Sequence, residues 1–318
     1  MLSPESVERL QWITRPHKSR SREAVPPPSF SERMSQRLRL RRLVHLMDPD
    51  AITTSLFLTN KALRDSFMDR TAWPVPRRLG TFPDASELVR RISRLDSVVV
   101  KPVRGSSSKG VFLLRRQGSS SWQDLRRGEI LAEMDLVERL RAVRVRMRAV
   151  ESWTAEELLI GSGNELGHPV DYKLYMFQEH VGLVLGKMHL PDDVAFRWWG
   201  PAWDPVETGK YASQIDEALP PPKDPDRIVS VAREAARELP TPFARIDLIE
   251  ASSGVYVSEV SPLPGQFHQF DEEVDRALGM YWEEAEVRMG EPGLWPRARR
   301  RSVRRMLRLS GRRKLIVD

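Results

Sequence analysis

A lysine stands between two short apolar runs that a loop of small residues joins. The stretch from 98 to 114 reads VVVKPVRGSSSKGVFLL. Three consecutive valines without helical periodicity predict a buried strand, and residues 111–114 predict the strand that returns beside it. This part of the chain is therefore constrained to an antiparallel pair whose connection, residues 102–110, is rich in glycine and serine.

The predicted connection has the chemistry of an anion site. Gly105 and Gly110 let the backbone come close to a ligand, and backbone NH groups and serine hydroxyls donate hydrogen bonds to it. Lys101 adds a positive charge at the strand end. The alternative is a flexible glycine-serine hairpin with a chance lysine. The glycine patterns of dinucleotide-binding, P-loop and α/β-hydrolase sites are absent from this stretch.

A second hairpin is predicted at 243–261, and each of its strands carries a carboxylate. The first strand reads FARIDLIE, the turn ASSG, and the second strand VYVSEVS, followed by PLPG. Carboxylates on paired central strands are unfavourable unless a cation compensates them. Asp247 and Glu259 can lie side by side across the pair, as oxygen ligands for a hard cation such as Mg²⁺. The alternative is an exposed strand face with ordinary surface acids.

Together the two clusters resemble the ATP-grasp superfamily of carboxylate-amine ligases. There a lysine strand and a glycine-serine loop close over ATP, and later Arg-x-Asp and Glu-x-Asn-x-x-Pro-Gly strands hold magnesium. The match spans most of residues 57–285. Residues 171–177 (DYKLYMF) and 156–159 (EELL) are most similar to the TupA-like group associated with teichuronopeptide biosynthesis. The Val-Lys-Pro, Gly-Ser-Ser and Arg-Ile-Asp segments are also similar to D-alanine-D-alanine ligases.

The resemblance implies a role for each matching position. It assigns Asp247 and Glu259 to magnesium, with Ser261 standing where many members have asparagine as a third ligand. Lys173 would lie near the reacting phosphate, and Arg245 with the Gly265 backbone NH would stabilise the acyl oxyanion. The remaining positions would contact ATP through its phosphates, the closing loop or the adenine: Lys61, Lys101, Gly105, Ser106, Ser107, Ser108, Gly110, Glu156, Glu157, Leu158, Leu159 and Asp171.

The implied fold class is α+β, with two α+β subdomains that clamp ATP between antiparallel sheets. We expect the lysine-bearing subdomain at 57–155 and the adenine and magnesium subdomain at 156–290. A basic arm and helix at 1–56 would precede them, and an Arg-rich tail at 291–318 would follow.

The implied reaction is ATP-dependent, ADP-forming ligation of a carboxylate to an amine through an acyl phosphate, with Mg²⁺ as cofactor. The resemblance connects it with cell-surface polysaccharide or peptide biosynthesis, or with secondary metabolism. One rival is an ATP-grasp phosphotransferase acting on a hydroxyl or sugar. The other is a non-catalytic polyanion-binding protein, which Ser261 favours and the joint presence of Lys101, Arg245, Asp247 and Glu259 disfavours. The acid, the amine and the oligomeric state stay open.

Composition limits the remaining classes. A chain of 318 residues that is 40% hydrophobic can form two domains. It has no cysteine, which excludes disulfides and thiolate sites, and its six histidines lack the close spacing of a zinc site. No stretch approaches the about 18 apolar residues that cross a bilayer, and the first residues lack a signal pattern. We expect a cytoplasmic protein, with peripheral attachment to the inner face of the membrane as an alternative.

Much of the net charge of +7 is local to the two ends of the chain. Residues 297–314 include ten arginines or lysines. On a helix, Val303, Met306, Leu307 and Leu309 would form a narrow apolar stripe beside a cationic face, suited to an anionic membrane surface, a nucleic acid or another anionic polymer. The alternative is a solvated or partly disordered charged end.

Aromatic residues are concentrated at 196–203. We interpret Trp198, Trp199 and Trp203 as packing residues, with stacking on a sugar or planar acceptor group as the alternative. His268 is interpreted as a surface or packing residue, with approach to a substrate amine as the alternative. Helices are predicted at 31–46, with Ser31 at the start, and at 85–95, 126–149 and 227–239.

Overall fold

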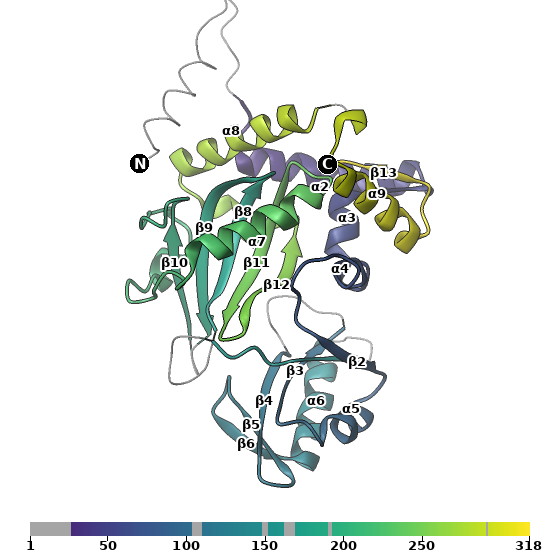
Figure 1. The fold of residues 1–318 in the computed structure, drawn as a ribbon, viewed down its shortest axis with the longest axis vertical. Helices are drawn as coiled ribbons and strands as arrows, with labels where there is room; N and C mark the ends of the chain where they lie inside the picture. Colours follow the sequence, from purple (N-terminus) through teal and green to yellow (C-terminus); the bar gives the residue numbers. More distant parts are fainter. Residues whose placement is uncertain (1–26, 104–109, 148–151, 162–168, 190–192, 291) are drawn as a thin grey trace, which may run out of the picture.

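Two antiparallel sheets, each with its own helices, make up most of the molecule (Figure 1). The computed structural model describes residues 27–103, 110–147, 152–161, 169–189, 193–290 and 292–318. Mixed helices and antiparallel sheets in two lobes confirm the expected fold class.

The smaller lobe is built on a six-stranded sheet whose helices cover one face. Its strands lie in the order β2 (Arg78–Phe82), β7 (Trp153–Glu156), β3 (Ser97–Pro102), β4 (Phe112–Gln117), β5 (Ser121–Asp124) and β6 (Glu129–Ala132). Helices α5 (Ala85–Ile92) and α6 (Glu133–Met147) pack against it. Burial alternates along β3, so Val98 and Val100 enter this core while Lys101 lies on the other face. The predicted β3–β4 hairpin is confirmed.

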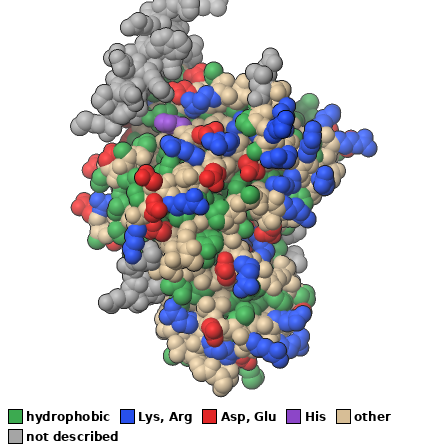
Figure 2. All heavy atoms as spheres, viewed as in Figure 1, with side chains coloured by type: hydrophobic (Ala, Val, Ile, Leu, Met, Phe, Trp, Pro, Cys, Tyr) green, Lys and Arg blue, Asp and Glu red, His purple; other side chains and the backbone are tan. Residues whose placement is uncertain are grey.

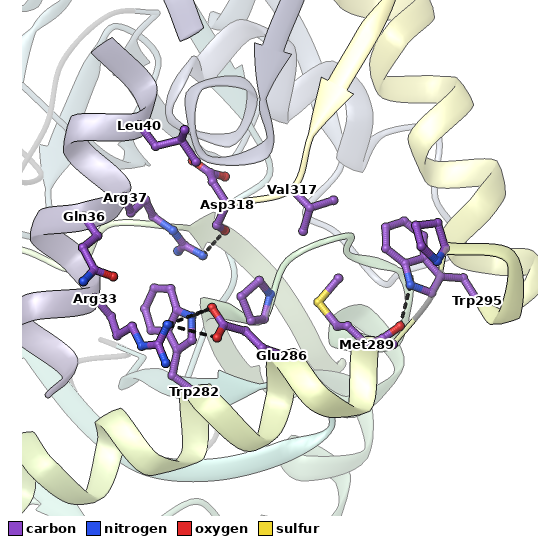
Figure 3. Close-up of a pocket in the computed structure, with 13 residues that line it drawn as sticks. Arg33, Gln36, Arg37, Leu40, Trp282, Glu286, Met289, Trp295, Val317 and Asp318 are labelled. Carbon is purple, nitrogen blue, oxygen red and sulfur yellow. Dashed lines mark hydrogen bonds and ion pairs between the residues drawn. The ribbon is translucent and has the colours of Figure 1, made fainter. Parts of the chain in front are cut away.

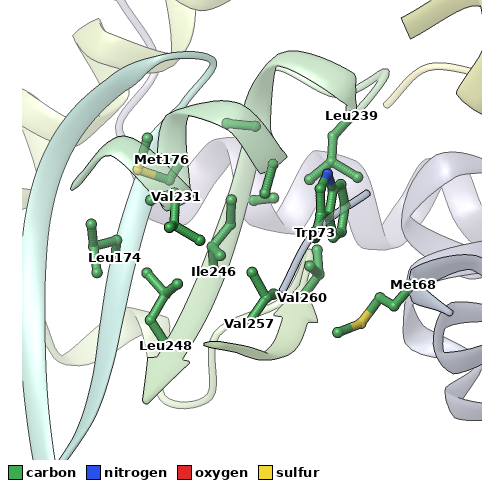
Figure 4. Packing of buried hydrophobic residues seen from close by; sticks show 14 of the residues in the cluster. Met68, Trp73, Leu174, Met176, Val231, Leu239, Ile246, Leu248, Val257 and Val260 are labelled. Atoms are coloured by element: carbon green, nitrogen blue, oxygen red, sulfur yellow. The ribbon is translucent and has the colours of Figure 1, made fainter. Parts of the chain in front are cut away.

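The larger lobe has a five-stranded sheet with helices on both faces. Its strands lie in the order β10 (Val194–Trp199), β9 (His180–His189), β8 (Asp171–Phe177), β11 (Phe243–Ala251) and β12 (Gly254–Ser261). Helix α7 (Pro225–Glu238) covers one face, where Leu174, Ile246 and Leu248 meet Val231 (Figure 4). Helices α2 (Phe30–Met47) and α8 (Glu272–Met289) cover the other face.

Strand β8 is buried on both faces, which explains its nearly continuous apolar sequence. Tyr172 and Leu174 pack toward α7, whereas Tyr175 and Phe177 join the aromatic cluster around Phe30. Lys173, on the same face as Tyr175, is therefore a cation placed at the edge of an apolar core. Such a position requires anionic partners nearby.

Shorter elements connect and cap the lobes. They are β1 (Ala51–Thr53), α3 (Thr54–Thr59), α4 (Lys61–Met68), α9 (Arg297–Ser310), β13 (Lys314–Ile316) and the 3-10 turns η1 (Ala212–Gln214), η2 (Phe267–Gln269) and η3 (Pro292–Leu294). Phe57, Leu58, Phe67 and Met68 pack in the core of the larger lobe. Residues 57–68 were expected in the lysine-bearing subdomain. They belong to the larger lobe instead, because their apolar side chains pack in its core.

The Arg-rich tail is an ordered helix that packs against α4 and α7. Met306 is fully buried, and Leu309 packs against the same core. The expected apolar stripe is therefore not available to a membrane, and a disordered tail is not what the structure contains. None of the helices in the described ranges combines the length and apolarity needed to cross a bilayer.

Local differences from the predicted helices have simple causes. Helix α2 begins at Phe30, because Ser29 rather than Ser31 forms the capping box with Glu32. The helix expected at 126–149 is shortened, because residues 129–132 pair as an edge strand before α6 begins. Trp198 and Trp199 pack in the cores on opposite faces of β10, which confirms their interpretation as packing residues.

Candidate functional site

Three charged residues, Lys173, Asp247 and Glu259, lie opposite one another on neighbouring strands of the larger lobe. The register of β11 and β12 sets Asp247 opposite Glu259, and the register of β8 and β11 sets Lys173 opposite Asp247. Residues opposite one another in a ladder project to the same face. The hairpin and its pairing of carboxylates are thus as the sequence predicted, with Lys173 added beside them.

Asp247 is buried between two cations. Its carboxylate accepts hydrogen bonds from Arg245 Nε at 2.6 Å and Arg245 Nη2 at 2.8 Å, and Lys173 Nζ lies 2.5 Å away. Burial alone would raise the pKa of Asp247, but the Arg245 guanidinium and then the Lys173 ammonium outweigh it and lower that pKa. Asp247 is therefore a fixed anion in the folded protein.

Lys173 is shared between two carboxylates, because it also pairs with Asp171 at the start of β8. Burial opposes its charge, yet Asp171 and Asp247 raise the pKa of Lys173. Burial raises the pKa of Asp171, and its Oδ1 atom is buried without a hydrogen-bond partner among the described residues. Asp171 and Asp247 thus keep Lys173 charged, and the Asp171 Oδ1 atom is left without a hydrogen-bond partner among the described residues.

Glu259 is more open and is paired with an arginine that the sequence analysis did not single out. Arg64 Nη1, on α4, lies 2.6 Å from Glu259 Oε1, and the Glu259 side chain is 42% exposed. Arg64 also contacts Asp65 on its own helix. Burial opposes the charge of Arg64, but Glu259 and Asp65 raise its pKa. The guanidinium thus occupies one oxygen of an otherwise accessible carboxylate.

The two lysines expected at the phosphates are close to each other. Lys61 begins α4, and its Nζ donates a hydrogen bond to the carbonyl of Pro102 at 2.5 Å. Lys101 Nζ pairs with Glu156 Oε2 at 2.6 Å. Burial first, and the neighbouring Lys101 ammonium second, lower the pKa of Lys61 to about 8. The Lys61 and Lys101 ammonium groups repel each other, and an anionic ligand bound between them would relieve this repulsion.

Helix α4 connects the two groups of charges. Its first residue contacts the smaller lobe at Pro102, and Arg64, one turn later, contacts Glu259 in the larger lobe. Residues three apart on a helix lie on one face. The first turn of α4, which belongs to the larger lobe, therefore brings Lys61 to the lysine-bearing strand of the smaller lobe and Arg64 to the carboxylate of β12.

The segment expected to hold adenine is the connection between the lobes. Glu156 ends β7 and is buried, and the Glu157 backbone NH donates to the Arg77 carbonyl at 3.0 Å. The Arg77 NH donates in turn to the Glu157 carboxylate at 2.7 Å. Leu158 is half-buried and Leu159 is buried beside this link. The segment then reaches the larger lobe, where the Ile160 carbonyl accepts from the Ser252 NH at 3.0 Å.

The closing loop lies only in part within the described residues. Gly110 has a φ of 76°, a left-handed conformation that favours glycine, two residues before β4. Gly105, Ser106, Ser107 and Ser108 lie outside the described residues, so their expected contacts stay predictions.

Ser261 and Gly265 follow the carboxylate of β12. Ser261 lies opposite Arg245 in the register, and its hydroxyl donates to the Leu263 carbonyl at 3.2 Å. A Cβ added at Gly265 would meet no atom within 4 Å. Packing therefore does not require glycine at 265, which leaves close approach of a ligand as a reason for it.

A buried lysine that the sequence analysis missed holds the Gly265 segment. Lys210 is 1% exposed, and its Nζ donates to the Gly265 carbonyl at 2.6 Å. Aromatic rings surround the ammonium, with centroids 4.7 to 6.0 Å away: Tyr175, Trp198, Tyr211 and Phe270. No carboxylate in the described part of the chain forms an ion pair with it. Burial first, and the Arg245 charge second, lower the pKa of Lys210 to about 7.

The backbone around Lys210 is held in unusual conformations. Gly209 has a φ of 71° and Tyr211 a φ of 60°, and Gln266, next to Gly265, has a φ of 53°. Left-handed conformations are uncommon for residues other than glycine, and they persist where surrounding structure imposes them. Here the Trp198 indole NH donates to the Lys210 carbonyl at 3.0 Å, which fixes the segment on β10.

The residues that sequence reasoning missed differ in how visible they were. Arg64 follows Lys61 by three residues, so helical spacing could have placed both on one face. Lys210 stands in a loop without periodicity, and only the fold brings it to Gly265. His268 is exposed, and its ring lies 3.9 Å between centroids from that of the adjacent Phe267, in agreement with a surface position.

Acidic and histidine side chains alone do not form a metal site in the described residues, where no group of three or more could hold an ion. The paired carboxylates of Asp247 and Glu259 supply two ligands at most, so a bound molecule would have to provide others. Mg²⁺ is commonly held in this way, by one or two carboxylates together with phosphate oxygens and water. The donor set therefore fits Mg²⁺ in the presence of a nucleotide.

A separate cavity of about 440 Å³ lies between α2 and α8 (Figure 3). Arg37, Trp282, Glu286 and Asp318 line it, and none of the described residues expected at the active site does. Arg37 donates to the Pro262 carbonyl at 2.9 Å and so contacts the loop that leads to Gly265.

Comparisons with known proteins identify a family. A family model described as TupA-like ATPgrasp matches residues 43–283. No curated protein matches the sequence.

Several solved structures are similar at low identity. D-alanyl-alanine synthetase A from Vibrio cholerae O1 biovar eltor is 14% identical over 79% of this chain and 72% of its own, with a TM-score of 0.47. D-cycloserine synthetase DcsG is 18% identical over 89% of this chain and 94% of its own, with a TM-score of 0.46. ATP-grasp ligase PsnB, complexed with minimal precursor, Mg and ADP, is 15% identical over 73% of this chain, with a TM-score of 0.40. The chain covers only 59% of the length of PsnB.

Proposed function

Because the chain belongs to the TupA-like ATP-grasp family, we propose that it is an ATP-dependent ligase that joins a carboxylate to an amine. ATP and Mg²⁺ are its proposed ligands. The observation that carries the proposal is the first turn of α4, where Lys61 contacts the lysine-bearing strand and Arg64 contacts Glu259. Cations that would bind phosphate and carboxylates that would bind a metal thereby meet at the junction of the lobes.

The phosphates of ATP would bind at Lys61 and Lys101. In the structure Lys101 is paired with Glu156. A phosphate would therefore either share the Lys101 ammonium with the Glu156 carboxylate or displace that carboxylate. The loop at 105–110 would cover the phosphates, and residues 156–159 and Asp171 would contribute to the nucleotide site. Exclusion of water by the loop would protect an acyl phosphate from hydrolysis.

Magnesium would be held by Asp247 and Glu259, with Ser261 contributing through its hydroxyl or through water. When bound, the ion would neutralise charge on the phosphate oxygens during transfer. Asp247 is kept ionised by Arg245 and Lys173, so the proposed ligand is ready at neutral pH. Arg64 would have to leave Glu259 free or turn toward a phosphate when the ion binds.

The proposed chemistry proceeds in two transfers. A carboxylate oxygen of the acid attacks the terminal phosphorus of ATP, and the bond to the ADP oxygen breaks. The amine then attacks the acyl carbon and loses a proton, phosphate leaves, and an amide remains. Lys173 would offset charge on the transferring group, while Arg245 and the Gly265 NH would stabilise the oxyanion. The resemblance supports substrates from cell-surface polymer or secondary-metabolite synthesis in the cytoplasm.

Trapping the intermediate tests this reaction directly. We expect ADP release only when a suitable acid is present with ATP and Mg²⁺, and added hydroxylamine should convert the acid to its hydroxamate. The full reaction should need an amine and yield an amide and phosphate. A phosphotransferase would instead give ADP and a stable phosphate ester without hydroxamate. Absence of nucleotide binding together with absence of ADP release would leave the polyanion-binding alternative.

Gly265→Ala should separate activity from stability. A Cβ at this position meets no protein atom, so we expect a melting temperature within about 1 °C of the wild type. Because the added methyl group would displace the reacting acyl group, turnover should fall by roughly 10²-fold. The measurement is ADP release beside a thermal melt. Gly293→Ala, which also meets no atom within 4 Å, is the matched control and should keep full activity.

A further inference from the structure

Aliphatic side chains are exposed at the end of α2. Leu43 is 52% exposed, and Leu46 and Met47 are each 79% exposed. Their spacing of three and four residues places them on one face of the last turns of the helix. Large apolar side chains that gather in the open on one helix face mark a surface for interaction rather than packing.

Cations border these side chains from two segments of the chain. Arg42 is exposed on α2 itself, and Arg312 donates to the carbonyl of Pro49, directly after the helix. Strand β13 pairs with β1, and Lys314 Nζ lies 3.0 Å from Asp48 Oδ2, so the segment that follows α9 is held beside the end of α2. Arg308, in the last turn of α9, is also exposed. Figure 2 shows Lys and Arg side chains gathered where Figure 1 places α9 and β13.

We define the α2–α9 face by Leu43, Leu46, Met47, Arg42, Arg308 and Arg312. The described residues show no ion pair for any of its three arginines, whereas the neighbouring Arg313 and Lys314 pair with Asp50 and Asp48. The face is therefore both apolar and cationic.

We propose that the α2–α9 face docks the protein on an anionic lipid bilayer. Its arginines would attract any polyanion, but a nucleic acid or an acidic polysaccharide gains little from three aliphatic side chains. The surface of an anionic bilayer can bind both the aliphatic and the cationic side chains, since leucine and methionine enter the acyl boundary while arginines contact the headgroups. The contact differs from the one expected for the tail, because the apolar part comes from α2 while the apolar side of α9 packs in the core.

This inference does not depend on the proposed reaction, and vesicle co-sedimentation tests it with the full chain. Vesicles of phosphatidylcholine alone are compared with vesicles of phosphatidylcholine and phosphatidylglycerol. We expect binding to the anionic vesicles only, weakening as salt is raised. Leu46→Ser with Met47→Ser should lower the partition coefficient by roughly tenfold per side chain. Arg42→Gln with Arg308→Gln should lower it by roughly fivefold per arginine.

Matched variants make the result specific to this face. Met134 and Val145, on α6, are 78% and 77% exposed, so Met134→Ser with Val145→Ser removes equally exposed apolar groups from the other lobe. Arg90→Gln with Arg91→Gln removes two exposed arginines from α5. Neither pair should change vesicle binding, and thermal melts of all variants should confirm that they fold.

Two outcomes would overturn the proposal. One is the absence of binding to anionic vesicles at low salt. The other is binding that Leu46→Ser with Met47→Ser leaves unchanged, together with equal affinity for heparin, which would assign the face to soluble polyanions.

Discussion

Glu259→Gln should remove the magnesium-dependent part of nucleotide binding while leaving the fold intact. A non-hydrolysable ATP analogue at about 100 times its dissociation constant stabilises a native protein by roughly 2.7 kcal/mol. For a chain of this size that is a shift of about 5 °C in the melting temperature. We expect this shift for the wild type with Mg²⁺, a smaller one without it, and no difference between the two conditions for Glu259→Gln.

The reason lies in the accessibility of the carboxylate. Asp247 is enclosed by Arg245 and Lys173, whereas the Glu259 side chain is 42% exposed and has one basic partner, Arg64. An uncharged amide keeps the shape of the side chain but is a much weaker magnesium ligand. Because metal stabilisation of a transferring phosphate contributes several kcal/mol, turnover should fall by about 10³-fold.

The matched control is Glu179→Gln. Glu179 is 45% exposed and pairs with Arg237 at 2.7 Å, so this variant breaks an equally exposed glutamate–arginine pair away from the site. It should behave as the wild type with the nucleotide analogue. If Glu259→Gln keeps the full magnesium-dependent shift, Glu259 is not a metal ligand and the assignment of β12 is wrong.

The parts of this fold that the sequence predicts are those fixed by local chemistry. The alternation along β3 places Val98 and Val100 in the core and Lys101 on the opposite face, as a strand period of two requires. The short turn between β11 and β12 sets the register only as far as Leu248 opposite Val257, and a one-residue shift beyond Leu248 then places Asp247 opposite Glu259 instead of Ser258. The hairpin can be read from neighbours in the chain, whereas the register shift that brings the two carboxylates opposite one another cannot.

The rest of the site depends on long-range packing. Residues 57–68 join the larger lobe because Phe57 and Phe67 fill its core, and only this packing brings Arg64 to Glu259. The Arg-rich tail forms an ordered helix because Met306 finds the same core. The composition of the tail indicates only that it is charged. It does not indicate the core against which its few apolar residues pack.

Lys210→Met should make the protein more stable at pH 6 and less active. Charging a buried lysine with no carboxylate partner is unfavourable, and Met keeps most of its volume without the charge. The lowering of its pKa from 10.5 to about 7 corresponds to about 5 kcal/mol lost from the free energy of unfolding below pH 7. Part of the gain is offset, because the Gly265 carbonyl loses its donor, at a cost of about 1–3 kcal/mol.

The pH dependence gives this prediction its sign. Between pH 7 and 10.5 the unfolded chain keeps the proton on Lys210 while the folded chain has lost it, so the wild type becomes more stable as pH rises through this window. The advantage of Lys210→Met should therefore shrink by about 4 kcal/mol from pH 6 to pH 10. The other titratable or charged groups at Lys210 are Arg245, Tyr175 and Tyr211. The pKa values of both tyrosines are raised by burial, and Arg245 stays charged.

Arg299→Met is the matched control for stability. Arg299 is also a buried cation, 5% exposed, and contacts Gln178 away from the site. Burial lowers the pKa of Arg299, yet a guanidinium stays protonated in proteins, so removing it should change stability by the same amount at pH 6 and at pH 10. Denaturant melts at the two pH values measure both differences, and a Lys210→Met effect that does not vary with pH would contradict a lysine that loses its proton near neutrality.

Activity and stability should move in opposite directions for Lys210→Met, which a purely structural lysine would not produce. We expect kcat to fall by roughly tenfold with the KM for ATP unchanged, since Lys210 holds the Gly265 segment rather than the proposed phosphate ligands Lys61 and Lys101. The left-handed conformations at Tyr211 and Gln266 support this expectation, since they lie next to Lys210 and Gly265, the two residues that the hydrogen bond joins. Strained backbone costs stability and is often retained where it positions a functional group.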